Sequence, residues 1–283
     1  MAVFYNQATL TYNGGVANSN IVSGEIVEAI TASKTATPST YRAGETITYV
    51  VSILNSGTTA VNGITVSDDL GAYTQNENTL VPLDYVENSV RYFVNGVLQP
   101  TPAVATQPTL TVSGINIPAG GNAVIVYRAT ANGFAPLLAE SEITNTATVT
   151  GGGIINPVTA SETVTSEDSA LLSISKAVTP SSITENGRLT YTFVIENSGN
   201  TEAVATDNLV VSDSFDPILS DLVVTFEGTT WTEGTEYTYS AATGEFATVA
   251  GQITVPAATF TTDASGATVI TPGTVTLTVS GTV

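Results

Sequence analysis

SKTATPSTYRAGETITYVVSILNSGTTAV, residues 33 to 61, recurs later in the chain as SKAVTPSSITENGRLTYTFVIENSGNTEAV, residues 175 to 204. Each copy is followed by a second matching segment, ITVSDDL (64 to 70) in the first and LVVSDSF (209 to 215) in the second. An internal repeat of this length indicates two copies of one structural module, each of which begins with a Ser-Lys strand.

Within both copies apolar and polar residues alternate, as in ETITYVVSIL and RLTYTFVIE. Because Thr, Val and Ile dominate these runs and Gly, Asn and Pro interrupt them, the pattern predicts short β-strands joined by turns. We predict an all-β chain of two tandem immunoglobulin-like β-sandwiches. The expected divisions are an N-terminal hairpin (1–30), a first sandwich (31–168) and a second sandwich (169–283).

The composition of the 283-residue chain excludes several function classes. Lys and Arg total 6 against 25 Asp and Glu, a net charge of -19, so nucleic acid and anionic membranes would be repelled. Cysteine and histidine are absent, which removes disulfides, the usual zinc sites and histidine-dependent catalytic triads. With no nucleophile elbow or phosphate loop, we predict no enzyme acting on a separate substrate and no cofactor.

Two further expectations concern metal binding and cellular location. Paired acids such as Asp68 with Asp69, and Asp213 near Asp216, lack the spacing of known calcium loops, so a solvated acidic surface is expected instead of a metal site. The start MAVFYNQATL has neither the basic region nor the apolar core of a secretion signal. Synthesis in the cytoplasm is therefore expected, with a removed signal or a different natural start left open.

The repeat contains a hairpin in an unexpected place. The first half ends in ITNTATVTGGGIINPVTASETVTSE (143 to 167), which leads into the second Ser-Lys strand, whereas the second half ends in VTLTVSGTV at Val283 without such a hairpin. A matching segment, FYNQATLTYNGGVANSNIVSGEIVEA (4 to 29), leads into the first Ser-Lys strand. Residues 1–30 therefore resemble the closing hairpin of a second-half sandwich.

Three placements of this hairpin are open. It can fold back onto residues 169–283 of its own chain and close a ring, complete the second sandwich of a neighbouring chain, or add an edge hairpin to the first sandwich. The repeat favours the neighbouring chain. The hairpin 143–167 closes the first sandwich and directly precedes the second. Residues 1–30 directly precede the first sandwich, so by the same relation they would close a sandwich that lies before it, in another chain. A step that repeats without closing produces a head-to-tail filament, here joined by strand addition.

Strand alternation also places polar residues among core side chains. The polar residues on apolar faces are Lys34, Asp68 and Asn145 for the first module, and Lys176, Asp213 and Asn6 for the second. Such residues are costly in an apolar core unless they meet one another. Lys34 and Lys176 are the only lysines, and they occupy equivalent positions.

The three residue types together suggest a covalent cross-link. Burial favours a neutral, nucleophilic lysine amine and a protonated acid, which polarises the Asn carboxamide, so a Lys-Asn isopeptide bond can form with ammonia as the leaving group. Lys34 would join Asn145 with help from Asp68, and Lys176 would join Asn6 of another chain with help from Asp213. The alternatives are an ordinary hydrogen-bonded cluster or a lysine that extends to the surface.

Asn55 and Asn197 are rival acceptors, because they too are matched between the halves and are in phase with core residues. Each precedes Ser-Gly, so a turn role is the simpler expectation for both.

The run of Ser-Lys, LNSG or ENSG, VSD and ITNTATVT resembles the bacterial surface-protein repeat known as domain of unknown function eleven, over nearly the whole chain. The resemblance implies immunoglobulin-like modules of cell-envelope proteins. Related modules in Gram-positive pili and adhesins carry internal Lys-Asn isopeptide bonds with an acidic catalyst, roles that fall by position on the six residues named above.

Two tandem modules without a secretion signal are also similar to the major proteins of ribbon-like endospore appendages of anaerobic spore-formers. That similarity implies synthesis in the mother cell, release at lysis, a place on the spore or cell surface and contact with other appendage proteins.

The leading hypothesis is a self-assembling, covalently cross-linked fibre subunit whose partner is itself. The alternative is a surface adhesin or carbohydrate-binding module with its site in the loops. Its candidate aromatic residues, Trp231, Tyr237 and Tyr239, lie in TTWTEGTEYTYS, a segment that is equally typical of a hairpin.

Overall fold

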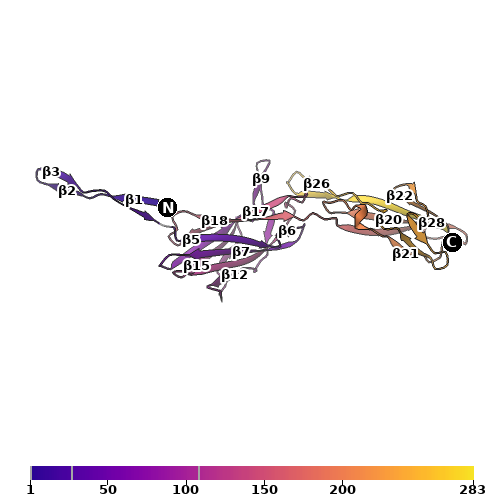
Figure 1. Ribbon diagram of the computed structural model, residues 1–283, viewed down its shortest axis with the longest axis horizontal. Coiled ribbons are helices and arrows are strands. Elements are labelled where there is room, and N and C mark those ends of the chain that lie inside the picture. Colours follow the sequence, from indigo (N-terminus) through magenta and orange to yellow (C-terminus); the bar gives the residue numbers. More distant parts are fainter. Residues whose placement is uncertain (1, 27, 108) are drawn as a thin grey trace. The chain divides into compact units, whose positions relative to one another are not determined.

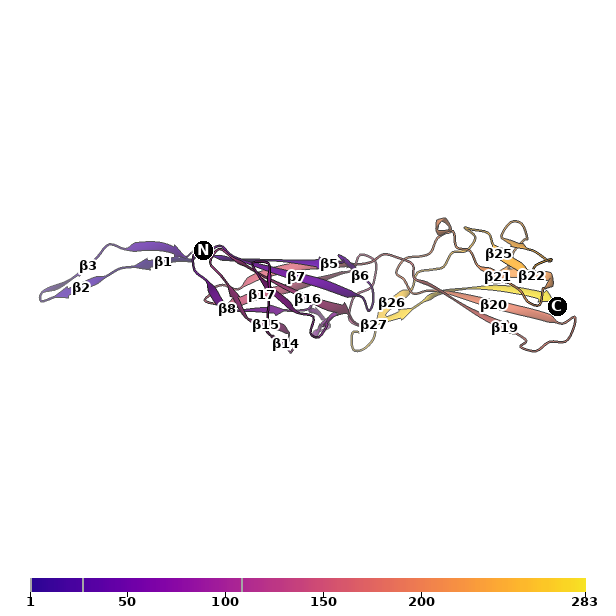
Figure 2. The same ribbon diagram turned by 90° about the horizontal axis from the view of Figure 1, so that it is seen from below.

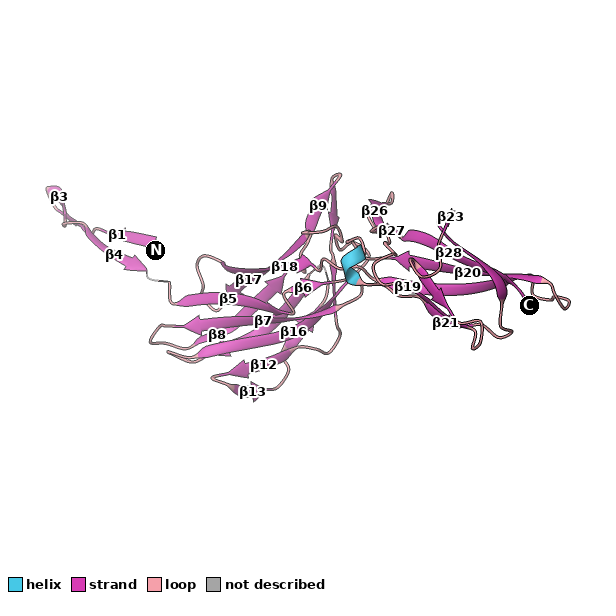
Figure 3. Ribbon diagram, turned by 45° about the vertical axis from the view of Figure 1, so that its right-hand side comes forward, coloured by secondary structure: helices cyan, strands magenta, loops and turns pink. Residues whose placement is uncertain are grey.

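Two compact units make up the chain in the computed structural model, which describes residues 2–26, 28–107 and 109–283. The first unit contains the chain up to Asn132 together with Ile143–Val164, and the second contains Gly133–Glu142 and Thr165–Val283. Strands account for the regular structure of both units (Figure 3), apart from a 3-10 turn at Ala205–Asp207. The prediction of an all-β chain with two immunoglobulin-like sandwiches is confirmed. Gly133–Glu142, expected in the first sandwich, lies in the second unit.

The first sandwich contains two antiparallel sheets (Figure 1). The first sheet has the order β13 (Val97–Gln99), β12 (Arg91–Val94), β16 (Asn122–Ala131), β7 (Thr46–Asn55) and β5 (Ile30–Thr37), and β11 (Leu83–Tyr85) pairs with the end of β16. The second has the order β14 (Ala103–Ala105), β15 (Leu110–Ile117), β8 (Val61–Asp68), β17 (Glu142–Gly151), β18 (Val158–Ser166) and β6 (Thr40–Tyr41). Strands β9 (Tyr73–Gln75) and β10 (Asn78–Leu80) form a separate hairpin.

The second sandwich repeats part of this plan (Figure 2). Its larger sheet has the order β19 (Leu172–Thr179), β20 (Arg188–Asn197), β28 (Gly273–Thr282), β22 (Ser220–Phe226) and β23 (Thr229–Thr230). Its smaller sheet contains only β21 (Ser212–Ser214), β25 (Glu245–Thr248) and β24 (Tyr237–Tyr239). A separate hairpin of β26 (Thr259–Thr262) and β27 (Thr268–Thr271) precedes β28.

Period-two alternation produces the core of each sandwich, because successive side chains of a strand point to opposite faces. In β7 the buried residues are Ile47, Tyr49, Val51, Ile53 and Asn55, and in β20 they are Leu189, Tyr191, Phe193, Ile195 and Asn197. The two sets match position by position, so the repeat seen in the sequence is a repeat of core positions.

The N-terminal segment forms a hairpin of its own. Strand β1 (Ala2–Asn6) pairs with β4 (Val22–Ile26), and β2 (Thr9–Tyr12) pairs with β3 (Gly15–Asn18). The return strand has one extra residue at Ser19–Ile21, and the Ser19 hydroxyl accepts a hydrogen bond from the Ala8 amide at 2.9 Å. Among the described residues, these four strands pair with no strand of either sandwich.

Asn55 and Asn197 tie two loops together in each sandwich. The Asn55 carboxamide donates to the carbonyls of Thr59 at 2.8 Å and Pro118 at 3.0 Å, and accepts from the Gly57 amide at 3.0 Å. Asn197 repeats these bonds with Thr201, Pro256 and Gly199. Both side chains are fully buried, and their amide nitrogens are used by structural hydrogen bonds.

Replacing Asn55 with Ala is expected to lower the free energy of unfolding of the first sandwich by about 1–3 kcal/mol, because buried backbone groups lose their partners. Denaturant unfolding of the full-length chain measures the loss. Exposed Asn62→Ala is the control and should change the free energy by less than about 0.5 kcal/mol. Equal effects of the two substitutions would contradict the structural role of Asn55.

Candidate cross-linking sites

Three strands bring Lys34, Asp68 and Asn145 into the core of the first sandwich. Lys34 lies on β5, Asp68 ends β8, and Asn145 lies on β17, whose neighbouring residue Ala147 is paired with Asp68. Lys34 is 5% exposed, Asp68 2% and Asn145 0%. The inward orientation predicted from strand alternation is therefore what the structure has for all three residues.

A chain of hydrogen bonds connects these three side chains through Tyr127 of β16. The Lys34 amine donates to Asp68 Oδ2 at 2.7 Å, and the Tyr127 hydroxyl donates to the same oxygen at 2.7 Å. Asn145 Nδ2 in turn donates to Tyr127 Oη at 3.0 Å. Asn145 Oδ1 has no hydrogen-bond partner among the described residues, so the carboxamide oxygen is free to accept a proton or hydrogen bond.

The electrostatics of the first site favour a reactive amine. Burial lowers the pKa of Lys34 below its usual value, and the neighbouring Asp68 carboxylate offsets this only in part. The Lys34 amine also lies 4.9 Å from the centre of the Tyr49 ring. Burial raises the pKa of Tyr127 well above its usual value, so its hydroxyl stays protonated at neutral pH. A lysine with a lowered pKa, linked to a carboxamide by a chain of hydrogen bonds, is chemically suited to amide transfer.

The second site contains the same ion pair in an open environment. Lys176 on β19 pairs with Asp213 on β21, and the Lys176 side chain is 41% exposed where that of Lys34 is 0%. Every residue of β19 is exposed, including Leu172, Ile174 and Val178. No Asn from residues 133–283 joins the Lys176 amine in a hydrogen bond among those described, and Asn6 lies on the N-terminal hairpin.

Tyr127 was not predicted from the sequence as part of a site. Its hydroxyl is the only group that joins Asp68 to Asn145 by described hydrogen bonds. The alternation of β16 places it on the inward face, but it is not one of the polar residues that recur in both halves. Strand register explains why: Tyr127 pairs with Tyr49, and the equivalent partner of Tyr191 is Val279.

Aromatic residues proposed for an adhesive site are used in packing. Tyr237 is 4% exposed, the Tyr239 hydroxyl donates to the Leu219 carbonyl at 2.7 Å, and Trp231 stacks on Phe226 at 5.1 Å between ring centres. These contacts give the three side chains a role in the second sandwich.

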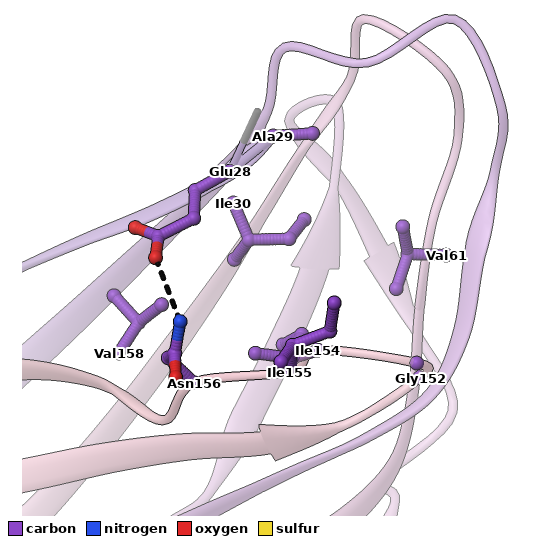
Figure 4. A pocket seen from close by; sticks show the side chains of 10 residues that line it. Glu28, Ala29, Ile30, Val61, Gly152, Ile154, Ile155, Asn156 and Val158 are labelled. Atoms are coloured by element: carbon purple, nitrogen blue, oxygen red, sulfur yellow. Dashed lines mark hydrogen bonds between the residues drawn. The ribbon is translucent and has the colours of Figure 1, made fainter. Parts of the chain in front are cut away.

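A hollow of about 150 Å³ lies at the start of β5 and contains neither lysine (Figure 4). Ile154, Ile155 and Val158 line it, and Asn156 donates a hydrogen bond to Glu28 at 3.1 Å across its mouth. Apart from Glu28 and Asn156, which bind each other, its lining is apolar or backbone. Among the described residues there is no cluster of three acidic side chains that could hold a metal ion. In the same part of the chain, no helix has the length and apolarity to cross a bilayer.

No family model and no curated protein matches this chain. Among solved structures, the major pilin subunit BcpA of Bacillus cereus aligns with 96% of this chain and 73% of its own, at 12% identity and a TM-score of 0.36. The C-terminal domain of the Streptococcus agalactiae polypeptide BspA aligns over 89% and 91%, at 13% identity and a TM-score of 0.36. The N-terminal domain of a Streptococcus gordonii adhesin aligns with 48% of this chain but only 32% of its own length, at 14% identity and a TM-score of 0.36. Similarities this weak say nothing about activity or partners.

Replacing Asp68 with Ala is expected to lower the free energy of unfolding of the first sandwich by about 3–5 kcal/mol, because Lys34 is left buried without its carboxylate. Asp213→Ala should cost the second sandwich at most about 1 kcal/mol, because Lys176 already contacts water. Hydrogen–deuterium exchange at the amides of β5 and β19 measures both. If Asp68→Ala also prevents the predicted Lys34–Asn145 bond, the difference in stability loss between the two variants becomes larger. Equal losses in the two variants would therefore contradict the expectation that burial makes the Lys34–Asp68 pair the more important one.

Proposed function

We propose that this chain is a structural fibre subunit that assembles head to tail, with residues 2–26 of one chain completing the second sandwich of another. The observation that carries the proposal is the uncovered inner face of β19, at the place where the first sandwich is closed by the β17–β18 hairpin. The occupant to which we commit is the N-terminal hairpin of a second copy.

The first sandwich provides the template for docking. There β17 pairs with β8, and β18 lies beside β17. Strand β21 is the counterpart of β8, but among the described residues it pairs only with β25, so its other edge has no strand. An unpaired edge of this kind accepts an added strand readily.

The hairpin carries the side chains that such a slot needs. Aligning FYNQATLTY with ITNTATVTG superimposes Phe4 on Ile143, Asn6 on Asn145 and Leu10 on Val149. The three residues of β17 are at most 2% exposed, whereas Phe4 is 52% and Leu10 65% exposed. Burial of one such side chain contributes about 1.5–3 kcal/mol, so docking the hairpin stabilises both the donor and the acceptor.

Docking would also complete the second chemical site. In this alignment Asn6 takes the position relative to the Lys176–Asp213 pair that Asn145 has relative to the Lys34–Asp68 pair. The Lys176 amine then attacks Cγ of Asn6, the Nζ–Cγ bond forms, the Cγ–Nδ2 bond breaks, and ammonia leaves. The same reaction joins Lys34 to Asn145 within the first sandwich. The substrate is the chain itself, and no separate substrate is needed.

The remaining properties of the chain fit a fibre outside the cell. A net charge of -19 keeps assembled fibres apart and soluble. The spore or cell surface is the proposed location, on the basis of the resemblance to surface-protein repeats and spore-appendage subunits, and other appendage proteins are the proposed additional partners.

Leu10→Asp is expected to abolish fibres seen by negative-stain electron microscopy, because it would bury a charge in the acceptor core. Thr11→Asp is the matched control: its counterpart Thr150 is not in the core, so fibres should persist. Both positions are exposed in the free hairpin, so neither change affects the monomer. Fibres that tolerate both charges equally would refute docking by this face.

Lys176→Ala is expected to leave fibres that fall apart to monomers when boiled in detergent and reductant, whereas the wild type remains as ladders or as material too large to enter a gel. The reason is that the substitution removes the amine for the bond between chains and leaves the hairpin unchanged. A proteolytic peptide linking Asn6 to Lys176 identifies the bond directly. Wild-type protein that loses two ammonia masses but stays a monomer would favour the closed ring instead.

A further inference from the structure

The Tyr127 hydroxyl contacts both the acid and the leaving group of the first site. It lies 2.7 Å from Asp68 Oδ2, which is also the oxygen that receives the Lys34 hydrogen bond, and 3.0 Å from Asn145 Nδ2. Formation of the amide requires one proton to travel from Lys34 Nζ to Asn145 Nδ2 so that ammonia, and not an amide anion, can leave. Among the described hydrogen bonds, the path between these two nitrogens passes through Asp68 and then Tyr127.

We propose that Tyr127 is a catalytic residue that carries this proton from Asp68 to the leaving nitrogen of Asn145. As the Nζ–Cγ bond forms, Asp68 takes a proton from Lys34. Tyr127 passes its own hydroxyl proton to Nδ2 and receives the proton held by Asp68. The Cγ–Nδ2 bond then breaks, ammonia leaves, and both Asp68 and Tyr127 return to their starting states. The inference rests on the proposed Lys34–Asn145 cross-link.

The second sandwich lacks this hydroxyl. Val279 occupies the position of Tyr127. Tyr127 pairs with Tyr49, and Val279 pairs with Tyr191, the residue equivalent to Tyr49. The aromatic ring is supplied from another part of the chain: Phe215, which directly follows β21, stacks on Tyr191 at 4.9 Å between ring centres, where Tyr127 stacks on Tyr49 at 5.5 Å. A phenylalanine ring fills the space but cannot relay a proton.

The difference sets an order for the two bonds. In the second site no hydroxyl hydrogen-bonds to Asp213 among the described residues, so the proton has no equivalent relay and the bond between chains forms more slowly than the bond within the first sandwich. Each chain therefore seals its own first sandwich before it is joined covalently to a neighbour.

The test is Tyr127→Phe, which keeps the ring stack and removes only the hydroxyl. Full-length chains are pulse-synthesised in a cell-free system, and the Lys34–Asn145 bond is followed by the loss of one ammonia mass from the first sandwich. General acid–base catalysis contributes about 10²–10⁴-fold, so slowing by about 10²-fold or more is expected. Bond formation at the wild-type rate would overturn the proposal.

Tyr92→Phe controls for stability. The Tyr92 hydroxyl also makes two hydrogen bonds, to the carbonyl of Asn116 at 2.8 Å and from its amide at 3.0 Å. Because it lies outside the site, its removal should leave the rate of bond formation unchanged. If Tyr92→Phe slows the bond as much as Tyr127→Phe does, Tyr127 has only a structural role.

Introducing the tyrosine into the second sandwich gives a further test, because a purely structural role of Tyr127 would not change the rate of the bond between chains. Val279→Tyr combined with Phe215→Leu copies the Tyr127 and Leu70 arrangement into the second sandwich and should accelerate the Lys176–Asn6 bond. Fibre formation separates the two proposals. If wild-type fibres contain both bonds and Tyr127→Phe has no effect on either rate, the relay alone is refuted. If the wild-type chain forms fibres but never loses ammonia, the cross-link and the relay are both refuted.

Discussion

A β-sandwich is stable only when the apolar face of each sheet is covered and the edge of each buried strand is paired. The first sandwich meets this requirement with β17, which pairs with β8, and with β18, which lies beside β17. In the second sandwich, β19 and β21 have no such covering strands among the described residues. The exposure of Lys176 is a consequence of this uncovered face, and in the proposed assembly the exposed hairpin of another chain would cover it.

Burial distinguishes the two lysine–aspartate pairs. Lys34 and Lys176 stand at equivalent positions and bind equivalent aspartates, but the side chain of the first is 0% exposed and that of the second 41%. Desolvation destabilises the charged amine of Lys34. The hairpin that would exclude water from Lys176 is also the segment that carries Asn6. One docking event would therefore supply the acceptor and the low-dielectric surroundings together.

The alternation of apolar and polar residues predicted which strand residues face the core and which face solvent. A period of two fixes the face of every strand residue, which is why Lys34, Asp68 and Asn145 were placed correctly in the core. Tyr127 was missed because it has no counterpart in the second half, where valine stands instead. The β26–β27 hairpin and the membership of Gly133–Glu142 in the second unit were missed for a related reason, since neither is part of the repeat. The Trp231 segment was ambiguous because period-two patterns do not tell a packed aromatic from a ligand-binding one.

The positions of the two proposed bonds determine how a pulled fibre would carry load. Tension entering a subunit at Asn6 follows the backbone to Lys34, crosses to Asn145, continues to Lys176 and passes into the next subunit. Residues 35–144 and 177–283 then lie outside the mechanical path, so load falls only on the segments 6–34 and 145–176, which include the N-terminal hairpin and the β17–β18 hairpin. The subunit would behave as a covalent cord of limited extensibility with two folded side branches, and sequence change in those branches would affect its tensile strength only where it prevents a bond from forming, as at Asp68, Tyr127 or Asp213.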